Sequence, residues 1–101
     1  MLPKVRKECI LIAAIRVARK PGGWSTLTRA QIASEAQCSD GLVSRALGDM
    51  ADVRRAVMRA AIKYEYLDLI AQGIASGYKP ALTLSPVLKH RAIACLVNLG
   101  E

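Results

Sequence analysis

The stretch that most constrains the fold is residues 28–47, which predicts two short helices joined by a tight turn. Thr28 and Ser39 stand where the two helices would begin, and a hydroxyl oxygen at that position accepts a hydrogen bond from a free amide of the first turn. Three apolar residues at helical spacing give the first helix one buried face: Ile32, Ala33 and Ala36. Because alanine is small, we expect a second helix to cross this face closely.

The second helix of the pair is predicted to have two different faces. Its inner face holds Leu42 or Val43, together with Ala46 and Leu47. The residues left for its outer face are Asp40, Gly41, Ser44 and Arg45. This layout is typical of a helix-turn-helix, whose second helix enters the major groove of DNA. The alternative is an ordinary helical bundle, because such bundles also contain amphipathic helix pairs with short turns.

The positive charge of the chain is concentrated in its first part. Residues 1–63 hold 12 Lys and Arg against 5 Asp and Glu, whereas residues 64–101 hold 3 of each. The net charge of +7 therefore belongs to the part that contains the helix pair. A one-sided basic surface indicates contact with nucleic-acid phosphates. The alternative is a solvated surface that serves solubility.

Composition favours packed helices over a sheet, so the predicted fold class is all-α. The chain is 52% hydrophobic but holds no Phe and one Trp, which predicts an aliphatic, alanine-rich core. Its 101 residues are expected to form one domain, residues 1–101. Within it we expect a three-helix DNA-binding core in residues 1–48. Residues 49–101 are expected to add one or two helices that mediate dimerisation.

The first helix is predicted over residues 4–20, where five apolar residues share one face: Ile10, Ala13, Ala14, Val17 and Ala18. Pro-Gly-Gly at residues 21–23 ends this helix. Trp24 is expected to pack back against it, with stacking on a nucleic-acid base as the alternative. Gly48 is expected to end the third helix and Asp49 to cap the fourth.

Helical periodicity continues from Met50, but it does not decide whether that helix breaks near Tyr64 or continues to Gly77. A turn is predicted at residues 78–80, and Ser85 followed by proline predicts the start of the last helix. The last helix carries an apolar stripe: Leu88, Ala92, Cys95, Leu96 and Leu99. This stripe is the predicted dimer interface, and the alternative is an intramolecular cover over the three-helix core.

The three cysteines predict neither a disulfide framework nor a metal site. Cys9, Cys38 and Cys95 are odd in number and widely spaced, and their spacing to His90 is not that of metal ligands. We interpret them as reduced core residues of a cytoplasmic protein.

The longest apolar run, residues 9–15, is too short to cross a bilayer, and the basic residues after it argue against a signal peptide.

The ordered combination of these residues resembles a known family. It is carried by Ile10, Leu11, Ala13, Ala14, Val17, Ala18, Gly23, Leu27, Thr28, Ile32, Ala33, Ala36, Cys38, Ser39, Gly41, Leu42, Val43, Leu47, Asp49 and Val53. Over about residues 6–60 the chain is similar to the N-terminal DNA-binding domain of TetR-family transcriptional regulators. The resemblance implies a homeodomain-like helix-turn-helix core. It also implies DNA-binding roles for Thr28, Ser39, Gly41 and Arg45, which match the family in position.

The chain departs from the family pattern at several positions. Gln37 stands where the family usually has Gly, and Met50 where a Lys often contacts phosphate. Ser44, Ala46 and Leu47 replace the usual Tyr, His and final aromatic of the recognition helix. The residues that follow the resemblance are too few for the family's ligand-binding and dimerisation domain. We therefore expect no small-molecule effector.

The sequence thus predicts a small repressor that binds a palindromic operator as a homodimer. The residues predicted to contact double-stranded DNA are Thr28, Arg29, Ser39, Asp40, Gly41, Leu42, Ser44, Arg45 and Arg55. Arg45 would bind a guanine through two hydrogen bonds, and Asp40 and Ser44 would contact other base edges. Thr28, Arg29 and Ser39 would hold phosphates. Further positive charge would come from Lys4, Arg6, Lys7 or Arg55.

The competing prediction is a protein-binding adaptor or antitoxin-like module that uses the helical bundle to dock a partner. The neutral second half, with its leucine-rich stripe, would suit that role. An enzyme is not expected, because the chain holds no glycine-rich phosphate loop, no metal-ligand cluster and no partner for His90 at catalytic spacing. No catalytic residue, metal or cofactor is therefore assigned.

Overall fold

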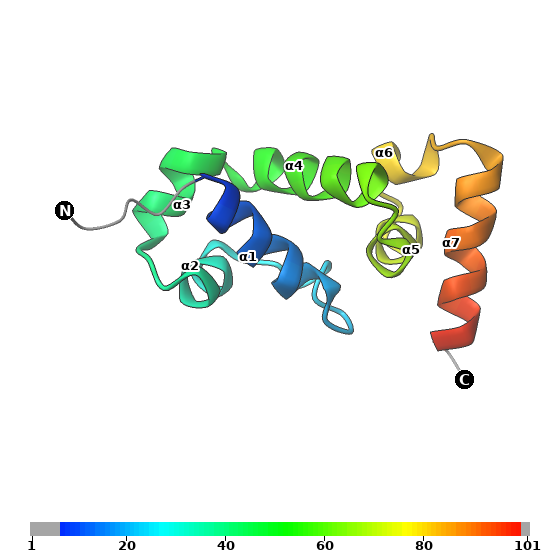
Figure 1. Cartoon of the computed structure of the whole chain (residues 1–101), viewed down its shortest axis with the longest axis horizontal. Helices are drawn as coiled ribbons and strands as arrows, with labels where there is room; N and C mark the ends of the chain where they lie inside the picture. Colours follow the sequence, from blue (N-terminus) through cyan, green and yellow to red (C-terminus); the bar gives the residue numbers. More distant parts are fainter. Residues whose placement is uncertain (1–6, 100–101) are drawn as a thin grey trace. The chain divides into compact units, whose positions relative to one another are not determined.

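The protein folds into helices throughout its computed structural model, which describes the backbone of residues 7–99 and the side chains of residues 7–94. Seven helices and no strand occur in this described part (Figure 1). They are α1 (Lys7–Arg19), α2 (Arg29–Ala36), α3 (Asp40–Leu47), α4 (Met50–Lys63), α5 (Leu67–Ala75), α6 (Lys79–Leu82) and α7 (Pro86–Leu99). The all-α prediction is confirmed.

The chain divides into two compact units, Met1–Val57 and Met58–Glu101, and the boundary between them falls inside α4. The first unit contains α1, α2, α3 and the beginning of α4. The second contains the end of α4 together with α5, α6 and α7. The boundary lies later in the chain than residue 48, where the sequence suggested that the DNA-binding core would end.

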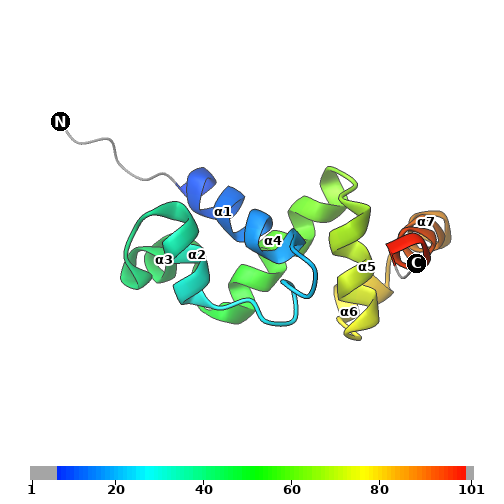
Figure 2. The same ribbon diagram turned by 90° about the horizontal axis from the view of Figure 1, so that it is seen from below.

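In the first unit, α1 supplies more buried apolar residues than any other helix. Its buried residues are Ile10, Ala13, Ala14, Ile15, Val17 and Ala18, so the predicted stripe is confirmed and widened by Ile15. Both α2 and α3 pack against α1, and Figures 1 and 2 show the two short helices beside it. Ile32 and Ala33 are buried on α2, where the small alanine side chain permits a close approach of the helices.

Trp24, which directly follows the Pro-Gly-Gly segment, is buried in the core of the first unit. Its side chain is 1% exposed, so its ring has no surface on which a base could stack. Nη1 of Arg54, on α4, donates a hydrogen bond of 2.7 Å to the backbone oxygen of Trp24. The guanidinium carbon of Arg54 also lies 4.9 Å from the centroid of the Trp24 ring. Residue 24 is therefore tied to α4 by both its backbone and its side chain.

Cys9 is exposed and Cys38 is half-buried. The interpretation of Cys9 as a core residue is therefore wrong. The buried face of α1 begins with Ile10, and a residue one position earlier is turned away from that face by about 100°. The side chain of Cys95 lies outside the described residues.

In the second unit, α4 ends at Lys63, and the break predicted as one of two alternatives near Tyr64 is the one observed. Glu65 adopts a left-handed conformation with φ 55°, and the amide of Tyr66 donates to the carbonyl of Ala61 at 2.8 Å. These are features of a Schellman ending, which satisfies free carbonyls at the end of a helix. The ending uses no glycine.

The turn predicted at residues 78–80 is wrong for Lys79 and Pro80, which are the first residues of the one-turn helix α6. Proline is favourable in a first turn because its missing N–H would have had no helical partner there. The amide of Ala81 donates to the carbonyl of Tyr78 at 3.0 Å, which closes the turn as a helix. With α6 and the break after Lys63, four helices rather than one or two follow α3 in the described chain.

The last helix, α7, packs against α5. Its predicted cap is confirmed, because Oγ of Ser85 accepts a hydrogen bond of 3.4 Å from the amide of Leu88. Leu88 is half-buried and Ala92 is fully buried, so the described part of the apolar stripe covers α5 within one chain. The side chains of the other predicted interface residues, Cys95, Leu96 and Leu99, lie outside the described residues.

None of the described helices has the length and hydropathy to cross a membrane.

Candidate nucleic-acid interface

The start of α2 is fixed by a reciprocal pair of hydrogen bonds. Oγ1 of Thr28 accepts from the amide of Gln31 at 3.2 Å, and the amide of Thr28 donates to Oε1 of Gln31 at 3.0 Å. This capping box confirms the predicted cap. The cap uses the hydroxyl oxygen of Thr28 as an acceptor, so the hydroxyl proton is still available to donate. Thr28 is exposed, which makes this proton accessible to a phosphate oxygen.

The turn between α2 and α3 is held by the left-handed conformation of Gln37, with φ 56° and ψ 49°. The amide of Cys38 donates to the carbonyl of Ala33 at 2.9 Å, and the amide of Gln37 donates to the carbonyl of Ser34 at 3.3 Å. These bonds form a Schellman motif, in which glycine is the usual left-handed residue. Two residues beyond Gln37, Ser39 caps α3, so the turn between the helices is short.

The third helix, α3, is fixed at its beginning and along its inner face. Oγ of Ser39 accepts a hydrogen bond of 3.2 Å from the amide of Leu42, which confirms the predicted cap. Val43 and Leu47 are buried at 0% and 7% exposure, whereas Leu42 is half-buried. Of the two residues predicted as alternatives for the inner face, Val43 is therefore the core residue. Ala46, also predicted to point inward, is half-buried.

The outer face of α3 is polar. Asp40, Gly41 and Arg45 are exposed and Ser44 is half-buried, as expected for residues that point away from the core. Positions 40, 41, 44 and 45 share one side of a helix because its period is 3.6 residues. The Asp40 carboxylate lies in the first turn, where the positive end of the helix dipole stabilises a negative charge. The outer face thus offers one carboxylate, one hydroxyl and one guanidinium within two helical turns.

The end of α3 and the start of α4 follow each other directly. Gly48 ends α3 with φ 92°, a conformation that favours glycine. Oδ1 of Asp49 then accepts from the amide of Asp52 at 2.8 Å, and the amide of Asp49 donates to Oδ2 of Asp52 at 3.1 Å. The predicted cap at Asp49 is therefore confirmed. The second hydrogen bond, in which the carboxylate of Asp52 accepts from the amide of Asp49, was not predicted, although the three-residue spacing is that of a capping box.

Asp52 also forms an ion pair with Arg55, one helical turn further along α4. The backbone hydrogen bond from Asp49 and the neighbouring guanidinium of Arg55 hold the pKa of Asp52 below its ordinary value of 3.8. The negative charge of Asp52 offsets part of the positive charge of Arg55. Arg55 is exposed, so a phosphate that approached it would compete with Asp52 for the guanidinium.

Arg29, another predicted phosphate contact, is the first residue of α2 and is half-buried. Its Nε is buried without a hydrogen-bond partner among the described groups of the protein. A buried donor without a partner carries a desolvation cost. Part of the Arg29 guanidinium is therefore turned into the protein rather than toward solvent.

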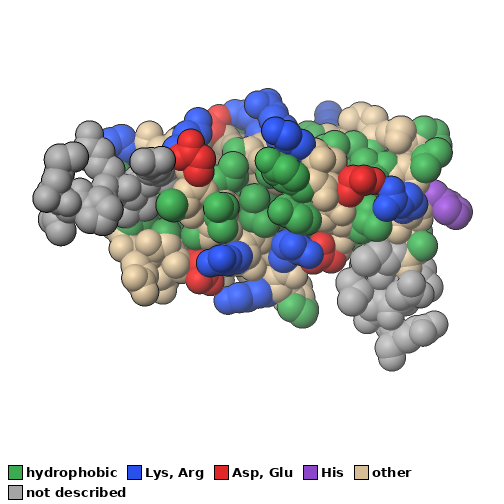
Figure 3. All heavy atoms as spheres, viewed as in Figure 1, with side chains coloured by type: hydrophobic (Ala, Val, Ile, Leu, Met, Phe, Trp, Pro, Cys, Tyr) green, Lys and Arg blue, Asp and Glu red, His purple; other side chains and the backbone are tan. Residues whose placement is uncertain are grey.

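Most Lys and Arg side chains of the described residues 7–63 reach the surface. The exposed ones are Lys7, Arg16, Arg19, Lys20, Arg45, Arg55, Arg59 and Lys63. Figure 3 shows Lys and Arg side chains over α1 and α4 on the face that it presents, and the histidine beside α7. Most of the positive charge of the described residues 7–63 is therefore available to an anionic partner.

Comparisons of the chain with protein-family models, with curated proteins and with solved structures found no match. The resemblance to the DNA-binding domain of TetR-family regulators therefore stays a prediction.

Proposed function

We propose that this protein is a sequence-specific regulator of transcription that binds double-stranded DNA, with α3 as the recognition helix. In this proposal it is a small cytoplasmic repressor that occupies a palindromic operator as a homodimer. The observation that carries the proposal is the division of α3 into two faces. Val43 and Leu47 are buried, whereas Asp40, Gly41 and Arg45 are exposed.

The capped starts of α2 and α3 support the proposal. Thr28 and Ser39 both accept backbone hydrogen bonds through their side-chain oxygens, and both are exposed. Each hydroxyl can therefore donate to a phosphate while it caps its helix, and the partial positive charge of a helix N-terminus favours an anion. Such contacts would position α3 against the groove without reading the base sequence.

Arg45 is the residue best suited to read a base. Its guanidinium is exposed on the outer face of α3 and carries donors in the geometry that matches O6 and N7 of guanine. Because Arg45 takes no part in the core, its removal is expected to leave the fold intact. Loss of the contact is expected to reduce discrimination at one base pair by about 1–3 kcal/mol.

A homodimer follows from the small footprint of a single recognition helix. One such helix reads only a few base pairs, and two copies related by a two-fold axis read a palindrome with half-sites about 34–36 Å apart. The zero net charge of residues 64–101, compared with +7 for residues 1–63, supports placing the dimer contact within residues 64–101. Leu96 is one of the predicted interface residues, and Leu96→Glu is expected to give monomers that bind the operator more weakly.

The experiment that tests the proposal is selection of bound sequences from random duplex DNA at near-physiological salt. We expect an enriched palindrome, and the same selection with Arg45→Ala should lose preference at one position of each half-site. Arg16→Ala, which removes an exposed arginine of α1, is the matched control and should keep the full motif. Binding without enrichment that falls steeply with salt would instead indicate charge-driven association with the phosphate backbone.

A protein-docking role is the second candidate, because exposed apolar side chains lie on α7. Val87 is 72% exposed and Ile93 is 42% exposed. In this role α7 would bind a partner protein, and the purified chain would bind no DNA in the selection. Val87→Asp would then abolish partner binding, whereas under the DNA-binding proposal it leaves the selected motif unchanged.

A further inference from the structure

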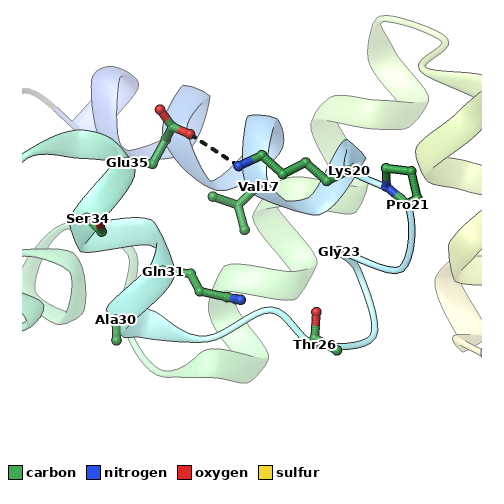
Figure 4. Close-up of a pocket in the computed structure, with 9 residues that line it drawn as sticks. All are labelled: Val17, Lys20, Pro21, Gly23, Thr26, Ala30, Gln31, Ser34 and Glu35. Atoms are coloured by element: carbon green, nitrogen blue, oxygen red, sulfur yellow. Dashed lines mark ion pairs between the residues drawn. The ribbon is translucent and has the colours of Figure 1, made fainter.

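A cleft of about 630 Å³ lies in the first unit, between the end of α1, the connection that follows it and α2. Figure 4 shows Val17 and Lys20 on the α1 side, Gln31 and Glu35 on the α2 side, and Thr26 on the connection. The volume is within the range of small-molecule sites, which is about 300–1,000 Å³. The cleft is separate from the outer face of α3, because none of its lining residues comes from that helix.

The cleft brings one positive and one negative side chain together. Nζ of Lys20 lies 3.9 Å from Oε1 of Glu35, and the two side chains are 67% and 32% exposed. An ion pair this long and this exposed contributes little to stability, so a ligand can separate the two charges at low cost. The ligand must then satisfy both charges, because a purely anionic or purely cationic molecule would meet one like charge.

Neutral groups inside the cleft complete the recognition pattern. Oε1 of Gln31 is occupied by the amide of Thr28, which leaves the side-chain NH₂ of Gln31 as a donor. Figure 4 draws this nitrogen toward the interior of the cleft. The hydroxyl of Thr26 donates to the carbonyl of Gly22 at 3.1 Å, so it can only accept from a ligand. Pro21, which is exposed, adds apolar surface to the cleft, and Val17 contributes only a small part of its side chain.

We propose that this cleft binds a free α-amino acid with an apolar side chain. Its carboxylate would contact Lys20 and the Gln31 amide, and its ammonium group would contact Glu35. Its side chain would lie against Pro21. An α-amino acid carries its two charges on adjacent carbon atoms, which matches the short separation of Lys20 and Glu35. The proposal goes beyond DNA binding and does not depend on it. It also differs from the expectation of no effector, which concerned the lack of a separate ligand-binding domain.

The test is a titration of the full chain, without DNA, followed by NMR and calorimetry. L-Leucine, L-valine and L-phenylalanine are the probes, and we expect saturable shifts of the Gln31 side-chain amide with at least one of them. Two analogues each lack one charge of leucine: 4-methylpentanoate and 3-methylbutylamine. Each is expected to bind at least about 10-fold more weakly, which corresponds to the loss of one charge-assisted hydrogen bond. Equal binding of either analogue, or no saturation with any amino acid, would overturn the proposal.

Variants of the two charges provide an independent test. Lys20→Met and Glu35→Gln should each weaken amino-acid binding at least about 10-fold. Arg16→Met and Glu8→Gln, which change exposed residues of α1 outside the cleft, should leave it unchanged. If the single charge variants bind like the wild type, the assignment of Lys20 and Glu35 is wrong.

Discussion

Arg54→Met is the substitution with the clearest expected effect on the first unit. Arg54 makes two interactions with the same residue: its Nη1 donates to the Trp24 carbonyl at 2.7 Å, and its guanidinium lies 4.9 Å from the Trp24 ring centroid. Methionine can replace the aliphatic part of the side chain and keep apolar contact with the ring. The substitution therefore removes the charged hydrogen bond and the cation–π contact while it preserves most of the packing.

The expected loss follows from these two interactions. A hydrogen bond to a charged donor contributes about 1.5–3 kcal/mol, and a cation–π contact contributes about 0.5–1 kcal/mol at exposed sites and more when desolvated. Arg54 is half-buried, which places the pair between these limits. Because methionine recovers part of the contact with the ring, we expect a decrease of about 2–3 kcal/mol in the free energy of unfolding. That is a large share of the stability of a small domain.

The assay is urea unfolding followed by tryptophan fluorescence. Trp24 is the only tryptophan of the chain and is 1% exposed, so its emission reports the opening of the first unit. The matched control is Arg16→Met, because Arg16 is exposed on α1 and its replacement should change stability by no more than about 0.5 kcal/mol. Equal unfolding midpoints for the two variants would show that the contacts of Arg54 with residue 24 do not stabilise the unit.

Three further substitutions test other features of the fold. Gln37→Gly should stabilise the first unit by about 0.5–1 kcal/mol in the same urea assay, because φ 56° disfavours a side chain and glycine relieves this strain despite its greater freedom when unfolded; unchanged or lower stability would contradict this. Asp52→Asn should lower stability at neutral pH, because the pKa of Asp52 is below 3.8 in the folded chain and its stabilising effect is present above that pH. As the pH falls through the pKa of Asp52 in the folded chain, the urea unfolding midpoints of the wild type and of Asp52→Asn should converge. A difference between the two midpoints that does not change with pH would refute the argument from the pKa of Asp52. Gly73→Val should destabilise the second unit by about 1–3 kcal/mol in thermal unfolding followed by circular dichroism. The reason is that a Cβ at residue 73 would meet Met58 and lie 3.1 Å from Cβ of Ala81. An unchanged melting temperature would show that the space between Gly73, Met58 and Ala81 can hold a larger side chain.

Most beginnings and ends of helices in the first unit could be predicted because they are specified by neighbouring residues; the left-handed conformation of Gln37 at the end of α2 is the exception. Thr28, Ser39 and Asp49 cap their helices through hydrogen bonds to amides three residues ahead, which the sequence spacing makes visible. Gly48 was predictable for the same reason, since its positive φ favours glycine. The apolar stripe of α1 was predictable from periodicity alone.

The breaks in the second unit were harder to predict because neither Glu65 nor Pro80 identifies its local structure by residue type alone. Glu65 adopts the left-handed conformation that glycine usually adopts at the end of a helix, so its residue type does not predict the end of α4. The one-turn helix α6 begins next to Pro80, and proline there is compatible with either a turn or a first helical turn. Periodicity cannot distinguish these cases because the apolar residues on both sides continue at helical spacing.

Contacts between residues far apart in sequence were the least predictable. The contact of Arg54 with Trp24 joins positions 30 residues apart, and the sequence gives no spacing signal for it. The same is true of Lys20, which directly follows α1, and Glu35, which lies on α2; they meet only because α1 packs on α2. The cleft that they line was therefore not predicted from the sequence, although both residues are ordinary surface charges when considered alone.

The position of α3 depends on two junctions that do not themselves belong to its outer face. Gln37 fixes the direction in which the chain leaves α2, and Gly48 fixes the direction in which it enters α4. Both have positive φ, so a change of residue type there alters the backbone rather than a single side chain. If α3 reads DNA, the angle between it and its neighbours decides which side chains reach the groove. Base recognition would then depend on Gln37 and Gly48 as well as on Arg45, even though neither junction residue would touch a base.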